Sequence, residues 1–94
     1  MSFKLRFHEL ALEEWKKLDN SIREPLKNKL AERLNNPRVT AAALAGMPDC
    51  YKIKLLRVGY RLVYRVEDET IFVTVIAIGK REKLKVYDAA KSRL

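Results

Sequence analysis

The sequence predicts an α+β fold: a small, mostly antiparallel four-stranded sheet with an N-terminal helical hairpin on one face and a short C-terminal helix. Two observations predict this class. Apolar residues alternate with polar ones in three segments and run together in a fourth, which is typical of strands, and elsewhere they recur with helical spacing. The order β-α-α-β-β-β-α segregates helices from strands, as in α+β proteins. We expect residues 1–94 to form one domain, because 94 residues supply a single modest core.

The first strand and the helical hairpin are expected within residues 3–36. Strict alternation over residues 3–7 predicts a half-buried strand, and the helix that starts at Glu9 is ended by Asp19-Asn20. Ser21 and Glu24 fit a capping box, so the second helix is expected to begin at Ser21 and to stop at Asn35-Asn36-Pro37. The apolar faces comprise Ala11, Trp15 and Leu18 in the first helix and Ile22, Leu26, Leu30 and Leu34 in the second.

The second half of the chain supplies the remaining strands and the last helix. Residues 38–47 have no clean period and predict an irregular connection with room for a helical turn at 40–44. Residues 70–78 are the most apolar run and should be the central strand, buried on both faces. Helical spacing from Leu84 to the C-terminus predicts the short last helix. We expect the helices on one side of the sheet, which leaves the opposite face concave and basic.

Residues 51–65 predict two strands joined at Arg57-Val58-Gly59, each apolar on one face and basic on the other. The apolar face of each strand is expected to point to the core, and it carries tyrosine, isoleucine or leucine at positions 51, 53, 55, 60, 62 and 64. The two strands present these residues on the same face only if the loop between them has two or four residues. In the simplest register Lys54 lies opposite Arg61, and such like-charge pairs cost about 0.2–1 kcal/mol. Either the long side chains splay into water, or the face is an anion site, for which phosphate is the expected ligand. The basic face carries Lys52, Lys54, Arg61 and Arg65.

Composition limits the chemistry. The net charge of +8 favours a polyanionic partner, either nucleic acid or an acidic protein. Cys50 is the only cysteine and His8 the only histidine, which argues against a disulfide, a cysteine metal site and a two-histidine ribonuclease mechanism. His8 is expected to cap or end an element, and the acidic residues 67–69 to form a solvated turn. We therefore expect no metal, no cofactor and, without an apolar run of membrane-spanning length, a cytoplasmic chain.

Cations alone could support RNA cleavage here. Lys52, Lys54 and Arg61 share one strand face, and Arg81, after the central strand, can reach the same rim. In the reaction a 2′-hydroxyl attacks the adjacent phosphorus, and fixed cations stabilise the charge that develops. Crowding by cations lowers the pKa of a lysine, so Lys54 is the best-placed base. Tyr87 either stacks on a splayed base or packs the last helix on the sheet, and the sequence favours neither.

The chain resembles the RelE toxins of the bacterial RelE/ParE superfamily nearly from end to end. The carrying segments are LAGMPDCYKIKL at 44–55, GYRLVY at 59–64 and IGKREK at 78–83, followed by Val86-Tyr87. The resemblance implies a metal-independent endoribonuclease that enters the ribosomal A site and cuts mRNA by 2′-hydroxyl attack. It assigns Lys54 as general base, Arg81 as general acid, and Tyr87 as stacking platform. The residues implied as charge stabilisers are Lys52 and Arg61. We expect further RNA contacts from the other basic residues around them, Arg57, Arg65, Lys80 and Lys83.

Two departures and two alternatives accompany this resemblance. Lys83 stands where close relatives often carry Arg, which loses bidentate phosphate geometry, and Leu56 replaces a common basic residue beside Arg57. The resemblance implies two partners: an acidic antitoxin that folds on binding and displaces or blocks the C-terminal helix, and the 70S ribosome with its mRNA and rRNA. The alternatives are a gyrase-inhibiting toxin on the same fold and a non-catalytic nucleic-acid-binding module.

Overall fold

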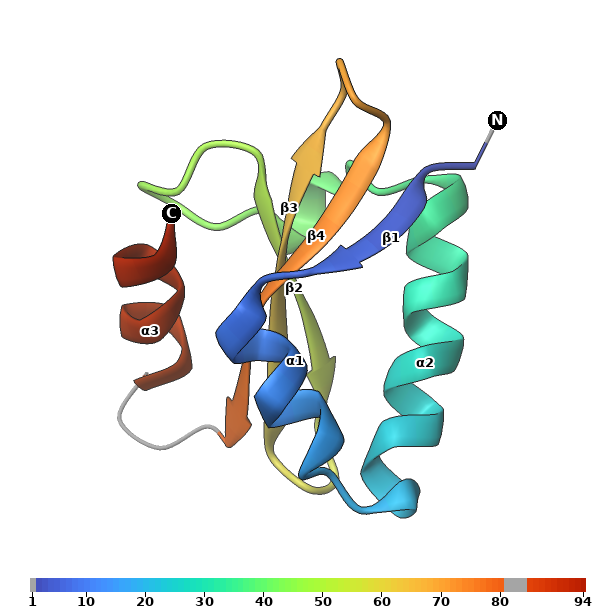
Figure 1. Cartoon of the computed structure of the whole chain (residues 1–94), viewed down its shortest axis with the longest axis vertical. Coiled ribbons are helices and arrows are strands. Elements are labelled where there is room, and N and C mark those ends of the chain that lie inside the picture. Colours follow the sequence, from blue (N-terminus) through green and yellow to red (C-terminus); the bar gives the residue numbers. More distant parts are fainter. Residues whose placement is uncertain (1, 81–84) are drawn as a thin grey trace.

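The computed structural model describes residues 2–80 and 85–94, which form a four-stranded sheet and three α-helices (Figure 1). The strand order is β1-β4-β3-β2, with β1 parallel to β4 and the other two pairs antiparallel. The predicted element order and the mostly antiparallel sheet are therefore confirmed. The elements are β1 (Lys4–Phe7), α1 (Glu9–Lys16), α2 (Asn20–Asn35), a 3₁₀ turn (Thr40–Ala42), β2 (Cys50–Leu55), β3 (Tyr60–Glu67), β4 (Phe72–Lys80) and α3 (Lys85–Arg93).

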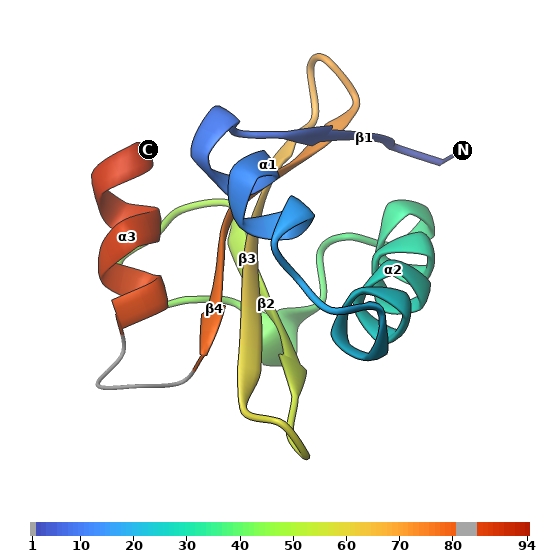
Figure 2. The same cartoon turned by 60° about the horizontal axis from the view of Figure 1, so that its bottom comes forward.

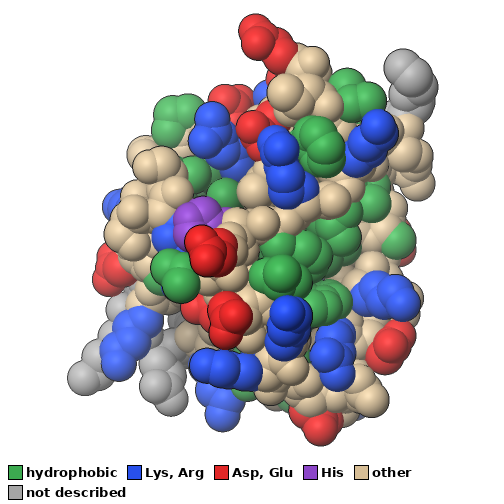
Figure 3. Space-filling view, viewed as in Figure 1, with side chains coloured by type: hydrophobic (Ala, Val, Ile, Leu, Met, Phe, Trp, Pro, Cys, Tyr) green, Lys and Arg blue, Asp and Glu red, His purple; other side chains and the backbone are tan. Residues whose placement is uncertain are grey.

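One face of the sheet forms the main core under α1 and α2. Helix α1 packs on β4 and α2 packs on β2, so the N-terminal hairpin covers a single face as predicted. Between the two helices Figure 3 shows a gathering of hydrophobic side chains with Lys and Arg around it. Tyr64, at the centre of this core, is fully buried, whereas Tyr60 is only half-buried. The buried strand residues of this core are Tyr51, Ile53, Leu62, Tyr64, Val66, Val73, Val75 and Ile78.

The start of α2 differs from the prediction. Asp19 is the N-cap residue, and its Oδ2 accepts hydrogen bonds from the Ser21 backbone N–H at 3.1 Å and from Ser21 Oγ at 2.6 Å. These bonds hold the pKa of the Asp19 carboxyl below its usual value. The predicted capping box of Ser21 and Glu24 is therefore wrong, because the Asp19 carboxylate, two residues earlier, caps the helix by accepting from the Ser21 N–H of the first turn.

A buried hydroxyl ties α2 to the sheet. The Tyr64 hydroxyl donates to the Pro37 carbonyl at 2.6 Å and accepts from Arg33 Nη1 at 3.0 Å. The same Arg33 nitrogen donates to the Lys52 carbonyl at 3.1 Å, so α2 closes part of the outer edge of β2. Burial outweighs the Arg33 hydrogen bond and raises the pKa of Tyr64.

Replacement of Tyr64 by Phe is expected to lower the free energy of unfolding by about 1–3 kcal/mol, because the buried Pro37 carbonyl loses its donor. Urea unfolding monitored by circular dichroism measures the change. Tyr60→Phe is the matched control, since the Tyr60 hydroxyl makes no hydrogen bond within the described residues and should leave stability nearly unchanged. Equal stability of Tyr64→Phe and the native chain would contradict the assigned role of the hydroxyl.

The opposite face of the sheet is only partly basic. Helix α3 packs there on β4 and β3, and Figure 2 shows α3 and α2 on opposite sides of the sheet. Its Val86 and Ala90 are buried in a second core. The expectation that all helices lie on one side and leave an open basic face is therefore wrong, because this face of β3 and β4 is apolar at its centre and needs a cover. The other members of this core are Met47, Cys50, Val63, Ile76 and Ala77.

Candidate active site

The β2–β3 hairpin places the predicted cations on one face, as the alternation of its residues indicates. Lys54 pairs with Arg61 and Lys52 pairs with Val63, so the like-charge pair expected from the simplest register is present. A four-residue loop over 56–59 joins the strands and ends at Gly59, whose φ of +69° lies in the left-handed region that favours glycine. On the other side of β3, Arg61 pairs with Gly79 of β4. No side chain on β4 therefore separates Arg61 from α3.

Arg61 is the most unusual side chain of this group because it is a buried cation. It is 8% exposed, and its Nε is fully buried without a hydrogen-bond partner. None of the ion pairs formed within residues 2–80 and 85–94 includes it. A buried guanidinium that lacks a carboxylate carries a desolvation penalty that an anionic ligand would relieve.

Tyr87 lies against Arg61 from the other side of the site. Arg61 Nη1 donates to the Tyr87 hydroxyl at 3.3 Å, a long hydrogen bond that joins β3 to the first turn of α3. The ring is half-buried and packs at the border of the second core. Tyr87 thus packs the last helix on the sheet and also lies within the cationic group, so both readings of this residue fit its position.

Lys54 is exposed and lies where two grooves meet. One groove, of about 530 Å³, runs between α2 and the hairpin loop, and its wall is mostly apolar, with Pro25, Leu56 and Val58. The other, of about 300 Å³, follows the edge of β2 and is basic. The cations along the two grooves are Lys29, Lys54 and Arg57 in the first and Lys29, Arg33, Lys52 and Lys54 in the second.

The other predicted RNA contacts are spread around this group. Arg57 lies in the hairpin loop beside Lys54. Arg65 lies at the far end of β3, next to acidic side chains that include Glu67 and Asp68. The Lys80 ammonium lies 5.9 Å from the ring centroid of Tyr60, on the side of the sheet that α1 and α2 cover. The structure therefore groups Arg57 with Lys52, Lys54 and Arg61, and places Arg65 and Lys80 away from them.

Two predicted site residues, Arg81 and Lys83, lie outside the described residues. The described ranges contain no group of three or more His, Cys, Asp or Glu side chains able to hold a metal ion. His8 is the N-cap of α1, where its Nδ1 accepts from the Leu10 backbone N–H at 3.1 Å, in agreement with the predicted capping role. Over the same ranges no helix has the length and hydrophobicity required to cross a membrane.

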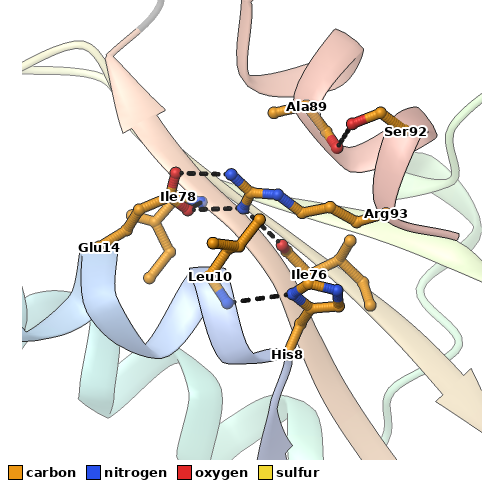
Figure 4. A network of polar contacts seen from close by, with 8 residues as sticks. All are labelled: His8, Leu10, Glu14, Ile76, Ile78, Ala89, Ser92 and Arg93. Carbon is orange, nitrogen blue, oxygen red and sulfur yellow. Dashed lines mark hydrogen bonds and ion pairs between the residues drawn. The ribbon is translucent and has the colours of Figure 1, made fainter.

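A polar network that sequence reasoning missed holds the last turn of α3 (Figure 4). Arg93 forms a two-pronged ion pair with Glu14 of α1, at 2.8 Å and 3.0 Å. This pair raises the pKa of Arg93 further, although burial opposes the shift. Only the placement of Arg93 in a last turn was visible in the sequence, because its partner is 79 residues away.

Comparison with known proteins agrees with this architecture. Residues 5–84 match the family described as ParE toxin of type II toxin–antitoxin system, parDE. Over 94 residues the chain is 55% identical to the mRNA interferase toxin RelE of Escherichia coli (strain K12), covering 100% of this chain and 99% of that protein.

Solved structures give the same result. A mutant of the E. coli toxin RelE in the free state is similar with a TM-score of 0.92 and 54% identity, over 100% of this chain and 99% of that one. The toxin of the intact E. coli RelBE toxin–antitoxin complex is similar with a TM-score of 0.84 and 56% identity, over 87% of this chain and 100% of that one. The resemblance seen in the sequence is thereby confirmed, and the chain belongs to the RelE-type toxins of the ParE toxin family of type II toxin–antitoxin systems.

Proposed function

We propose that this chain is a ribosome-dependent endoribonuclease that cleaves mRNA in the ribosomal A site and thereby inhibits translation. The observation that carries the proposal is the buried guanidinium of Arg61, which has an unbonded Nε and no carboxylate partner among the described residues. A phosphate oxygen is the kind of partner that this site lacks. The 55% identical E. coli protein is named an mRNA interferase, which fits the same chemistry.

The reaction assigns each cation a separate task. Lys54 takes the proton of the 2′-hydroxyl, whose oxygen then attacks the adjacent phosphorus. The bond from phosphorus to the 5′-oxygen breaks, Arg81 protonates that oxygen, and a 2′,3′-cyclic phosphate remains. Lys52 and Arg61 stabilise the negative charge that develops on the phosphorane oxygens. Arg57, Arg65, Lys80 and Lys83 are assigned to RNA contacts, and Arg57 lines the same groove as Lys54.

The ring of Tyr87 is assigned to a base next to the scissile bond. Extruded RNA bases commonly stack on tyrosine, and a base held beside Arg61 would bring its phosphate toward the same guanidinium. No step of this scheme draws on a metal ion, because Lys52, Arg61 and Arg81 supply the positive charge.

Partners follow from charge and family. The net charge of +8 suits an acidic antitoxin, and the E. coli relative has been crystallised in an intact complex with its own antitoxin. The same charge suits the 70S ribosome with its rRNA and mRNA. Both partners imply action in the cytoplasm.

One observation favours a second function. The matching family is described by the ParE toxin, so gyrase inhibition on the same fold is the alternative. This alternative predicts loss of supercoiling and DNA breaks, and it gives no role to a general base at Lys54.

Primer extension on a translated message tests the proposal. We expect cuts inside codons that disappear when ribosomes are omitted, and growth arrest on expression that Arg81→Ala relieves. The E. coli relative, assayed in parallel, is the positive control. Cleavage without ribosomes would contradict the A-site assignment, and DNA breaks without RNA cleavage would favour the gyrase alternative.

A further inference from the structure

Strand β1 leaves part of one edge of β4 uncovered. Strand β1 pairs with β4 only from Phe72 to Val75, and β4 continues for five residues beyond that point. The pairing of β4 with β3 shifts at the same place, because Val63 pairs with Ala77 and Tyr64 with Val75, so Ile76 has no partner. Backbone groups of β4 past Val75 therefore need hydrogen-bond partners other than β1.

Glu14 and Arg93 supply those partners. Arg93 Nη1 donates to the Ile76 carbonyl at 2.9 Å, and the Ile78 N–H donates to Glu14 Oε1 at 3.1 Å. The two side chains also bind each other, and Figure 4 shows them meeting above β4 between α1 and α3. Their side chains are 32% and 12% exposed, respectively. The ion pair thus replaces the missing strand along this edge, and it holds the last turn of α3 in one position.

The first turn of the same helix carries Tyr87. Arg93 follows Tyr87 by six residues, which is about 9 Å along a helix. The apolar contacts of α3 come from Val86, just before Tyr87, and Ala90, between Tyr87 and Arg93, and such contacts resist sliding weakly compared with directed hydrogen bonds. The 3.3 Å bond from Arg61 to Tyr87 is already long, so a small shift of α3 would break it.

We propose that Glu14 and Arg93 are positioning residues for RNA cleavage, because their network on the edge of β4 fixes α3 and so sets Tyr87 against Arg61. This inference rests on the proposed function. Neither side chain is needed at the phosphate, and both act through the helix. Loss of either therefore changes the geometry of the site and leaves its cations in place.

The test compares Glu14→Gln, Arg93→Gln and the double variant with the matched controls Glu13→Gln and Lys91→Gln, which are exposed neighbours on the same helices. Steady-state cleavage of ribosome-bound message is measured well below the unfolding midpoint. We expect kcat to fall about 10- to 100-fold with KM unchanged, because misplacement by about 1 Å can cost that much. The double variant should lose no more than the worse single variant, and Arg93→Lys, which keeps one prong, should recover part of the rate.

Amide hydrogen exchange over residues 85–93 and the NMR signals of the Tyr87 ring provide a readout that does not require cleavage. Both are expected to change in the Glu14 and Arg93 variants and to match the native chain in the controls. A native kcat together with a lowered midpoint, additive losses in the double variant, or an unchanged Tyr87 ring signal would each overturn the proposal. If the native chain cleaves no message, the proposed function fails, and the exchange and ring signals still decide whether the pair positions α3.

Discussion

Replacement of Arg61 by Met is expected to reduce mRNA cleavage by about 10²- to 10³-fold, since it removes a fixed charge at the site of developing negative charge. The same change is expected to raise the free energy of unfolding by about 1 kcal/mol or more. Arg61 is 8% exposed and its Nε has no hydrogen-bond partner, so folding buries a charge that no carboxylate within residues 2–80 and 85–94 neutralises. Methionine fills much of the same volume without this penalty.

Cleavage rates on a translated message measure the first effect, and urea unfolding curves measure the second. Lys16→Met, at the exposed end of α1, is the control for the loss of one positive charge and should change neither quantity appreciably. A less stable Arg61→Met variant would contradict our interpretation, because it would mean that the guanidinium holds the fold together.

Replacement of Lys54 by Arg is expected to reduce cleavage by about 10²- to 10⁴-fold, although the charge is conserved. At rest near neutral pH a guanidinium already carries its proton, so it cannot accept another from the 2′-hydroxyl; it can only give one to a stronger base such as the leaving 5′-oxygen, the task assigned to Arg81. Lys52→Arg is the matched comparison from the same strand face, and its loss should be much smaller because a charge stabiliser needs only to remain cationic.

The dependence of the rate on pH separates the two lysines further. A general base gives a rising limb in the profile of kcat, and that limb should be absent in Lys54→Arg and retained in Lys52→Arg. If the two variants lost equal amounts of cleavage rate and both kept the rising limb, Lys54 would act only as a charge stabiliser.

These two predictions describe a site that is costly to fold. Like charges face each other at Lys54 and Arg61, and Arg61 is buried under Tyr87. Neither feature benefits the isolated chain, and the phosphate that the proposed function places beside Lys54 and Arg61 would account for both. Sites that conflict with stability in this way are expected where function is located.

The sequence by itself determined the elements, the faces of the strands and the family. Alternation placed Tyr51, Ile53, Leu62 and Tyr64 in the core and Lys54 opposite Arg61, because side chains alternate across a strand and a short loop limits the register. These features depend on residues close together in the chain, which is why the pattern suffices to predict them.

Only the tertiary structure decided how far each charge is buried and what holds the last helix. The sequence pattern did not show that α3 covers Arg61, that Asp19 and not Ser21 caps α2, or that Glu14 pairs with Arg93. Burial and the ion pair depend on which surfaces meet when distant segments pack, and the cap depends on where the chain turns between α1 and α2. Glu14 of α1 and Arg93 of α3 meet where β1 has ended, because the uncovered edge of β4 offers both side chains a backbone group to bind.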